Sequence, residues 1–337
     1  MIQRNGVPGQ IGSAEWRQLV ARGSGDESQT PQWARLQTSL GKIPIVIVRN
    51  QTLLSGTMTL SIGRLPIRFL HFASGPVFGT GLYSHADFDK VLCDIDELGL
   101  RLKVAYVTFF PGLEDDNRDA YNLLTAHGFQ QVDGFLPSET FLIDLQKPME
   151  SLWDGLTRST RKHVRRGESL GLKLRAGWDI EKFCQMWPMA TPSSRDFLRN
   201  LHAEVDGAEM YFADSQQGTV SAALTVKSAS RVKYLLGGTN RNVSIGGEWL
   251  LWQLIMRAKG VSSHFDLGGA MVTRRCFRRS SAEQRKYRGV AEFKQGFGGS
   301  LTRYLGQFDK AYNRSVYKYL TWGKTALLRA YPTKWVL

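Results

Sequence analysis

A lysine beside a glycine-rich turn is the side chain in this sequence that is best suited to chemistry. Lys294 lies in residues 292–299, which read EFKQGFGG. An ammonium group there can meet a phosphate or a developing oxyanion, and glycines let the backbone approach a ligand closely. Phe297, in the same turn, is a candidate substrate-binding residue. The alternative is that Phe293 and Phe297 fasten a helix end to a sheet and that Lys294 points to water.

Asp266 is the second candidate for catalysis. It comes at the end of a short apolar strand, shortly before the pair Gly268-Gly269. A carboxylate in that place can accept the proton of an attacking amine, but it can equally be a hydrogen-bonded structural group. The sequence offers no rival arrangement of the Ser-His-Asp, HExxH or paired-carboxylate kind.

The cysteines and histidines predict neither a metal site nor a disulfide framework. Cys93, Cys184 and Cys276 stand far apart without a CxxC spacing, and the 6 histidines form no cluster in the sequence. We therefore expect no metal, and a reducing, cytoplasmic setting.

A predicted basic helix is a candidate for binding an anionic substrate. Its cations are Arg158, Arg161, Lys162, Arg165 and Arg166. Residues at spacings of three and four share one side of a helix, and guanidinium groups bind phosphate oxygens in pairs. Arg161 and Arg165 are the predicted phosphate-binding residues, although a solvated charged face explains the pattern nearly as well.

A second basic group lies between Asp266 and the Lys294 turn, interleaved with Phe277 and Tyr287. Its members are Arg274, Arg275, Arg278, Arg279, Arg285 and Lys286. Arginines mixed with aromatic rings favour an unpaired RNA end, because bases stack on rings while phosphates meet the cations. A solvated loop is the alternative.

The elements that must position these residues follow a similar order in both halves of the chain. In the first half we expect strands over 43–49, 53–62, 69–73 and 102–110 and a helix over 85–98. In the second we expect helices over 149–169 and 248–259 and strands over 139–145, 209–213, 219–227, 231–236 and 264–267, with a turn at Gly237-Gly238. Each half ends in a Gly-Phe pair, so a mixed α/β fold occurring twice is predicted.

The length and composition of the chain predict two domains, and its net charge predicts an anionic partner. The 337 residues are 42% hydrophobic and carry a net charge of +14, which favours RNA, phosphorylated metabolites or an acidic membrane face. A merely soluble basic protein is the alternative. No stretch approaches the roughly 20 apolar residues that cross a bilayer, and the first residues do not suggest secretion.

The expected domains are a leader over residues 1–30, a first domain over 31–145, a second over 146–308 and a tail over 309–337. The tail mixes aromatic and basic residues, as does a segment at a membrane interface. Packing against the domains is the default interpretation of the tail.

Several motifs give the chain a resemblance to known families. Residues 241–246 (RNVSIG) resemble the R/Q-x-x-G-x-G/A loop of the GNAT acyltransferases, with Ser244 in place of the first glycine. A longer ordered series resembles the FemABX family and covers residues 29–309. It consists of QTPQWAR (29–35), ASGPV (73–77), SETFLIDL (138–145), TRKHVRRG (160–167), FDLGG (265–269) and FKQGFGG (293–299).

The FemABX resemblance implies two tandem GNAT-like domains, that is, acyl-CoA N-acyltransferase-like α/β domains with mixed sheets. It implies transfer of an amino acid from aminoacyl-tRNA to a peptidoglycan-precursor peptide held in a cleft, by a monomer that needs no cofactor beyond aminoacyl-tRNA as co-substrate. The expected substrate-binding residues are Trp33, Arg161, Arg165, Gly238 and Phe297, and the second basic group is expected to contact the tRNA.

The sequence also departs from the family pattern and leaves alternatives open. Gln37 stands where relatives commonly have a lysine, Gln307 lies near a position that is often acidic, and no long coiled-coil hairpin is present. An acyl-CoA-dependent N-acyltransferase using residues 241–246, tRNA-dependent aminoacylation of a natural-product peptide, and a non-catalytic RNA- or membrane-binding protein remain as alternatives. A peripheral contact with the inner membrane face fits the lipid-linked form of the precursor.

Overall fold

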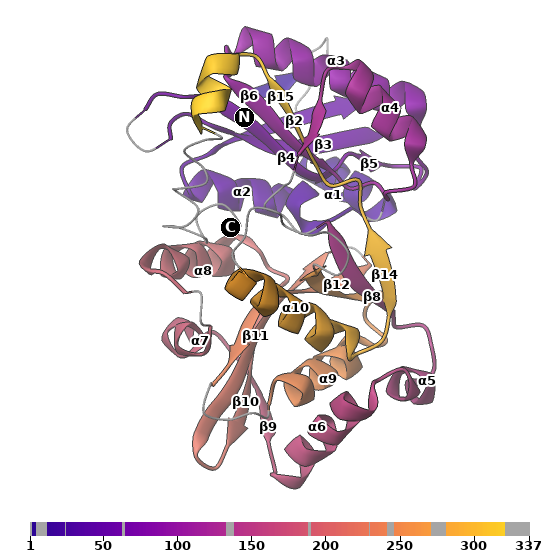
Figure 1. The fold of residues 1–337 in the computed structure, drawn as a ribbon, viewed down its shortest axis with the longest axis vertical. Coiled ribbons are helices and arrows are strands. Elements are labelled where there is room, and N and C mark those ends of the chain that lie inside the picture. The colour runs from indigo at the N-terminus through magenta and orange to yellow at the C-terminus, as the bar shows by residue number, and fades with distance from the viewer. Residues whose placement is uncertain are drawn as a thin grey trace. The chain divides into compact units, whose positions relative to one another are not determined.

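The computed structural model divides the chain into two compact units (Figure 1). The first is Met1–Ser138 with Arg303–Val336, and the second is Glu139–Thr302. The structure describes residues 2–4, 12–23, 25–62, 65–132, 138–187, 190–228, 230–240, 246–270 and 281–320. Two domains were predicted from the sequence, but the first unit also includes a segment from the C-terminal end of the chain.

The first unit is built on an eight-stranded mixed sheet with the order β1-β2-β3-β4-β6-β15-β7, while β5 pairs with β3. Its strands are β1 (Ile2–Arg4), β2 (Ile43–Arg49), β3 (Thr52–Thr59), β4 (Phe69–Gly75), β5 (Val77–Phe78), β6 (Tyr106–Pro111), β7 (Gln130–Val132) and β15 (Gln307–Ala311). Its helices are α1 (Ser13–Arg22), η1 (Glu27–Gln29), α2 (Pro31–Ser39), α3 (His85–Arg101) and α4 (Arg118–Ala126).

Helices cover both faces of this sheet (Figure 1). Successive residues of a strand point to opposite faces, so Ile45 and Ile47 pack with Phe88 of α3, whereas Val46 packs with Trp16 of α1. The apolar side chains of α3 recur at helical spacing, as the sequence predicted. The helix continues through Gly99 to Arg101, beyond the expected end at residue 98. The ring of Tyr312 occupies the space that a side chain at Gly99 would need.

The first 30 residues are more firmly held than the predicted leader. Within the described residues, Trp16 is buried and its indole N–H donates to the backbone carbonyl of Gln29 at 2.7 Å. The Gln29 amide in turn donates to the backbone carbonyls of Ser55 and Ala73. The Gln29 side-chain oxygen also accepts from the Ser55 N–H, so three backbone groups of β3 and β4 hold this buried amide. Burial of Trp16 and Leu19 adds apolar contact.

Strand β15 joins the first unit, although the sequence-based boundaries put its first residues in the second domain. It pairs antiparallel with β6 and β7. The buried Asp309 carboxylate accepts hydrogen bonds from the Thr108 hydroxyl, the Gln307 amide and the Tyr317 hydroxyl. Residues 314–320 are helical, and Leu320 is buried beside Tyr106. The described part of the predicted tail thus packs on the first unit.

The second unit has a seven-stranded sheet with the order β14-β8-β13-β12-β11-β10-β9. Its strands are β8 (Glu139–Asp144), β9 (Lys173–Ala176), β10 (Ala208–Ser215), β11 (Gly218–Ser228), β12 (Arg231–Thr239), β13 (His264–Ala270) and β14 (Ser300–Arg303). Its helices are α5 (Met149–Asp154), α6 (Arg158–Ser169), α7 (Ile180–Met186), α8 (Pro192–Glu204), α9 (Gly247–Ala258) and α10 (Ser281–Gln295). The apolar α9 supplies the centre of the core.

Two expectations for this unit need correction. The single helix expected over 149–169 is two helices, because Gly155 ends α5 and the Thr157 side chain caps α6 by accepting from the Thr160 N–H. The turn expected at Gly237-Gly238 is part of β12, since these residues pair with Ala223 and Ala222 of β11.

Candidate active site

Strands β12 and β13 separate part-way along the second unit's sheet. They run parallel and pair at Arg231–His264, Val232–Phe265 and Lys233–Asp266, and no further pairing joins these two fully described strands. In the first unit the corresponding parallel pair, β4 and β6, stays joined along its length. After Lys233, the backbone groups of β12 that face β13 have no hydrogen-bond partner in that strand. Such groups need another partner, so this edge of β12 is suited to bind a ligand.

At the point where the two strands separate, only a glycine fits close to the backbone of β12. Gly268 has a φ of +70°, and a Cβ there would lie 2.5 Å from the backbone oxygen of Tyr234. The pairing of β13 with β8 shifts register between Asp266 and Gly269, which is the mark of a bulge. The Gly268-Gly269 pair, expected to follow the strand, therefore forms the bend within it.

Lys294 lies at this divergence. It comes from the last turn of α10, is 7% exposed, and its Nζ donates to the carbonyl oxygen of Gly269 at 2.7 Å. The ammonium also lies 5.8 Å from the centre of the Tyr234 ring. Burial lowers the pKa of Lys294 to about 8; Asp266 raises the pKa and Lys233 lowers it further. The alternative interpretation, in which Lys294 points to water, is therefore wrong.

Asp266 is tied down on both carboxylate oxygens. Its Oδ1 accepts from the Thr140 hydroxyl at 2.5 Å and from the Gly268 N–H at 2.8 Å, and Oδ2 lies 3.6 Å from an Arg231 nitrogen. The residue is 3% exposed. This arrangement fixes the bend that carries Gly269, the partner of Lys294. The proton-accepting role predicted for Asp266 stays a prediction.

The glycine-rich turn approaches the protein's own backbone. A Cβ at Gly296 would clash with the Thr160 hydroxyl, one at Gly298 would lie 2.8 Å from the Gly155 oxygen, and one at Gly299 would lie 2.7 Å from the Leu142 oxygen. These glycines lock the turn onto β8 and the α5–α6 connection. The close approach to a ligand that the sequence suggested has this intramolecular explanation.

Phe297 packs in the core with Phe293, and the ring centres are 5.3 Å apart. The two rings hold the C-terminal end of α10 in place, as the alternative interpretation proposed. The buried ammonium group of Lys294 is therefore carried by a helix end that two packed rings hold in place.

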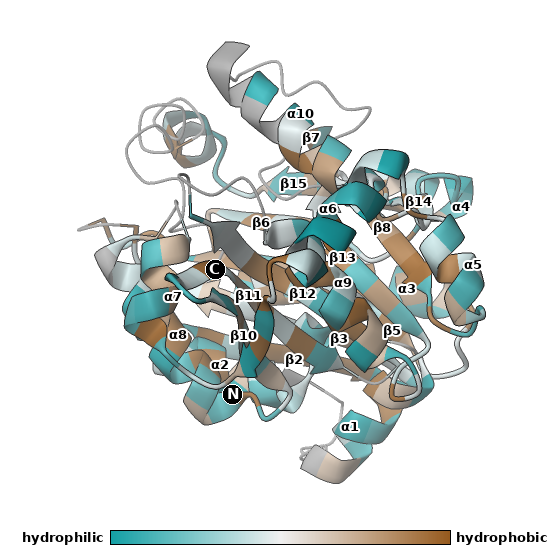
Figure 2. Cartoon of the chain, turned by 90° about the horizontal axis from the view of Figure 1, so that it is seen from below, coloured by the Kyte–Doolittle hydropathy of each residue, from teal (hydrophilic) through white to brown (hydrophobic). Residues whose placement is uncertain are grey.

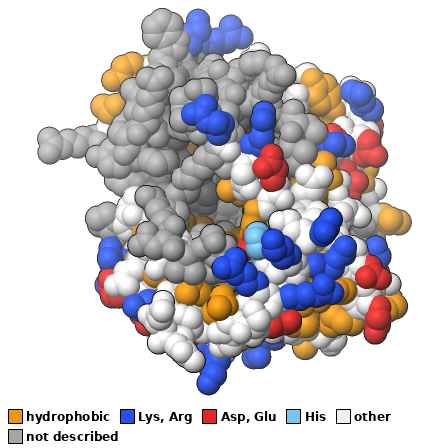
Figure 3. All heavy atoms as spheres, turned by 60° about the horizontal axis from the view of Figure 1, so that its bottom comes forward, with side chains coloured by type: hydrophobic (Ala, Val, Ile, Leu, Met, Phe, Trp, Pro, Cys, Tyr) orange, Lys and Arg blue, Asp and Glu red, His pale blue; other side chains and the backbone are white. Residues whose placement is uncertain are grey.

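Most cations of the basic helix α6 are exposed. The ribbon of α6 is largely hydrophilic in Figure 2, and Lys and Arg side chains gather on the face of the molecule drawn in Figure 3. Arg161 differs, because one guanidinium nitrogen donates to the carbonyls of Leu156 at 2.6 Å and Asp154 at 3.0 Å. These carbonyls belong to the end of α5 and the loop after it. The exposed Arg165 lies over the Trp153 ring at 5.5 Å. Both guanidinium groups therefore have structural partners, and their phosphate-binding role stays a prediction.

The structure places the other predicted binding residues as follows. Trp33 is half-buried in the first turn of α2, and Gly238 lies on β12, where its carbonyl accepts from the Ser221 hydroxyl. Gln37 is buried. Arg285 is exposed on α10, whereas Arg274, Arg275, Arg278 and Arg279, and the side chain of Lys286, lie outside the described residues. Residues 241–245 of the GNAT-like loop also lie outside them.

Helix α9 begins beside the divergence without a capping side chain. Its N-cap is Gly246, which has a φ of +135° and makes no side-chain cap bond. The carboxylate of the first-turn Glu248 accepts a hydrogen bond from Nδ1 of His163 on α6 at 2.9 Å. Free N–H groups at a helix start suit an anion, but Glu248 offsets part of that attraction.

Sequence reasoning missed Tyr234, Thr140 and Arg231, which surround Lys294 and Asp266. Thr140 lies in the segment 138–145 that carries the FemABX resemblance, but nothing in that segment marks it as a partner of Asp266. Tyr234 and Arg231 lie on a strand whose alternation only signals burial. Their role depends on the register between strands, for which a single sequence carries no local signal.

Each unit has a mixed sheet with helices, and two such units in one chain define a tandem GNAT-like fold. Solved structures confirm this fold. A structure titled FemX is 15% identical, covers 92% of this chain and 98% of that chain, and has a TM-score of 0.76. L-PGS from Bacillus licheniformis is 13% identical over 93% and 96%, with a TM-score of 0.58. A tandem GNAT protein from the clavulanic acid biosynthesis pathway is 13% identical over 89% and 94%, with a TM-score of 0.50.

Residues 193–324 match the model of the FemAB family. The FemX structure and this chain share the same fold, which agrees with the resemblance to the FemABX proteins seen in the sequence. A comparison with curated proteins gave no match. The family match and the fold together support an acyltransferase. Within the described residues, no helix has the length and apolarity to cross a membrane.

Proposed function

We propose that this protein transfers an amino acid from aminoacyl-tRNA to the amine of a peptidoglycan-precursor peptide. The observation that carries the proposal is the buried Lys294 ammonium at the point where β12 and β13 separate. The parallel pair β4 and β6 of the first unit does not separate in this way. The FemAB match, which includes β12, β13 and α10, supports the same chemistry.

The reaction needs positioning and charge stabilisation more than an activated nucleophile. The acceptor amine forms a C–N bond with the carbonyl carbon of the aminoacyl ester, and the C–O bond to the terminal ribose breaks. The proton of the amine ends on the departing ribose oxygen. The aminoacyl ester supplies the leaving group, so the protein contributes alignment and stabilisation of the oxyanion.

In the proposal Lys294 stabilises that oxyanion. Its Nζ donates one hydrogen bond to Gly269, so two further N–H groups of the ammonium remain for a substrate oxygen. A buried ammonium interacts with a developing negative charge more strongly than a solvated one. Asp266 acts as a positioning residue, because it holds the Gly268 bend and so sets the place of Gly269.

The cations supply the anion-binding surfaces of the proposal. The exposed basic side chains of α6 suit the diphosphate of the precursor, and Arg285 with its neighbours along the sequence suits the tRNA. A net charge of +14 favours both partners. The proposal requires no cofactor besides the aminoacyl-tRNA co-substrate, and it places the protein in the cytoplasm, with access to the inner membrane face when the precursor is lipid-linked.

One experiment tests the donor and the acceptor together. Purified protein is incubated with mixed charged tRNAs and the UDP-linked or lipid-linked precursor, and the product mass is measured with and without RNase. The expected result is a mass increment of one amino acid that RNase abolishes. A product that forms after RNase treatment, or no product with any charged tRNA, contradicts the proposal.

An acyl-CoA-dependent N-acyltransferase is the second candidate. The uncapped start of α9 at Gly246 favours it, because free N–H groups there suit a pyrophosphate. Calorimetry with acetyl-CoA distinguishes the two candidates. Saturable binding together with CoA-dependent acylation of the precursor would replace the tRNA proposal. A natural-product peptide offered as acceptor in place of the precursor tests the alternative of a natural-product substrate.

A further inference from the structure

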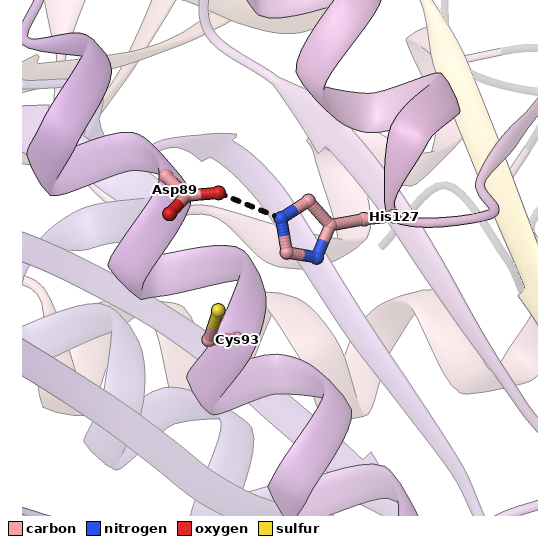
Figure 4. Close-up of side chains that lie close together, drawn as sticks. All are labelled: Asp89, Cys93 and His127. Carbon is pink, nitrogen blue, oxygen red and sulfur yellow. Dashed lines mark hydrogen bonds and ion pairs between the residues drawn. The ribbon is translucent and has the colours of Figure 1, made fainter.

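Three side chains with metal-binding atoms come together in the first unit (Figure 4). Asp89 and Cys93 lie one turn apart on α3, and His127 is the C-terminal cap of α4. A spacing of four places the first two on the same face of the helix. One carboxylate oxygen, the thiol sulfur and one imidazole nitrogen all lie within 4.8 Å of one another.

The imidazole of His127 has the orientation of a metal ligand. Its Nε2 points to Asp89, with 2.8 Å to the carboxylate oxygen, and its Nδ1 lies 3.5 Å from the Asp96 carboxylate. A metal-binding histidine commonly directs its second nitrogen to a carboxylate, which fixes the tautomer and the ring. Asp96 provides that carboxylate here and leaves Nε2 for the cation.

Asp96 is itself held in place from the C-terminal part of the unit. Its Oδ1 accepts from the Lys310 ammonium at 2.5 Å and from the Tyr312 hydroxyl at 2.8 Å. Lys310 also balances the charge of Asp96. Asp94, the other nearby acid of α3, pairs with Arg49 through two hydrogen bonds.

The remaining charges match a divalent cation. With Asp94 and Asp96 balanced by Arg49 and Lys310, Asp89 and a Cys93 thiolate provide two negative charges beside a neutral imidazole. A carboxylate, a thiolate and an imidazole are the ligand types that Zn²⁺ accepts, and three protein ligands leave the fourth tetrahedral position to water. Cys93 is exposed, which makes that position accessible to solvent.

We propose that Asp89, Cys93 and His127 bind one Zn²⁺ ion or a similar divalent cation, with Asp96 orienting the imidazole. The bound ion joins α3 to the end of α4 and stabilises the first unit. This inference stands apart from the proposed transfer reaction, which needs no metal. It also departs from the sequence-based expectation of no metal site, because the ligands converge only in the folded chain.

The test uses tag-free, reduced protein stripped with EDTA and then titrated with Zn²⁺ in a calorimeter and with Co²⁺ in a spectrophotometer. The expected result is one equivalent of Zn²⁺, a thiolate-to-cobalt charge-transfer band and a raised melting temperature. Cys93→Ser should abolish the band and weaken binding at least about tenfold, and Asp96→Asn should weaken it about 10- to 100-fold. The matched control is Cys184→Ser, which should keep the full signal.

Two results would overturn the proposal. The first is the absence of saturable binding to the wild-type chain, which would leave His127 as a hydrogen-bonded tie between α3 and α4. The second is wild-type Zn²⁺ affinity in Cys93→Ser. Because Cys93 is exposed, this variant is expected to fold, and circular dichroism checks that it does.

Discussion

The ammonium group of Lys294 donates a hydrogen bond to the backbone carbonyl of Gly269, although 25 residues separate them in the chain. The contact joins the last turn of α10 to the bend of β13. It lies beside the edge of β12, which stops pairing with β13 after Lys233. Burying an ammonium group costs free energy, and the lowered pKa of Lys294 expresses that cost. A charge kept at such a cost, beside the edge of β12 that no longer pairs with β13, is typical of a functional site.

Lys294→Met should lower transfer about 100- to 1000-fold, the usual loss when one oxyanion donor is removed. Methionine fills similar space without a charge, so the fold is expected to persist. Initial rates with charged tRNA and precursor measure the first effect, and thermal unfolding checks the second. Turnover equal to that of the wild type would remove Lys294 from the mechanism.

The same residue predicts a pH dependence of stability. Lys294 has a pKa of about 8 in the folded chain, below the ordinary lysine value of 10.5. Between these values the unfolded chain binds more protons, so the free energy of unfolding should rise with pH, by at most about 3 kcal/mol. Below about pH 8 and above about 10.5 the contribution should be flat.

Urea unfolding of the wild type and Lys294→Met at pH 7.5 and pH 10 measures this contribution. The difference between the two proteins should move in favour of the wild type at the higher pH, because other titrating groups cancel. A difference that is the same at both values would show that Lys294 is not desolvated in the folded chain.

Gly268→Ala should destabilise the second unit more than Gly171→Ala. Both glycines have positive φ, +70° and +66°, so each alanine costs roughly 1–2 kcal/mol of backbone strain. Only Gly268 also has a backbone atom in the way, the Tyr234 oxygen, whereas nothing lies within 4 Å of a Cβ at Gly171. Denaturant midpoints compare them, and equal losses would mean that the strands are not closely packed at Gly268.

Arg161→Ala should cost about 1–3 kcal/mol of stability, because the carbonyls of Leu156 and Asp154 lose a charged donor. Lys162→Ala, on the exposed face of the same helix, should stay within about 0.5 kcal/mol. A stability loss in both or in neither would contradict this assignment. The KM for the precursor is measured at a temperature where Arg161→Ala is folded. A raised KM would support the predicted contact between Arg161 and a phosphate of the precursor.

Arg285→Gln should weaken tRNA binding and reduce its dependence on salt. Arg285 is exposed on α10, and each phosphate contact contributes a slope of about 1 to the plot of log affinity against log salt. Glu292→Gln, on the same helix and also exposed, is the control and should not reduce that slope. An unchanged slope in Arg285→Gln would exclude this residue from the tRNA surface.

Several parts of the fold follow from local patterns. The hairpin of β2 and β3 and the amphipathic helix α3 were predicted closely, because alternation and helical spacing report burial directly. The two-unit plan followed from the repeated order of elements. Other boundaries were wrong: Gly99 lies within α3 and Gly155 interrupts a predicted helix, because tertiary neighbours and caps decide where a glycine ends a helix.

The amino-acid sequence by itself indicated the mixed α/β class, the resemblance to the FemABX proteins and the choice of Lys294 and Asp266 as residues of interest. Only the tertiary structure decided that Lys294 meets Gly269, that the glycine-rich turn packs on its own protein, and that Asp89, Cys93 and His127 converge. The physical reason is that composition, motifs and periodicity are local. Contacts between distant residues depend instead on strand register and helix packing.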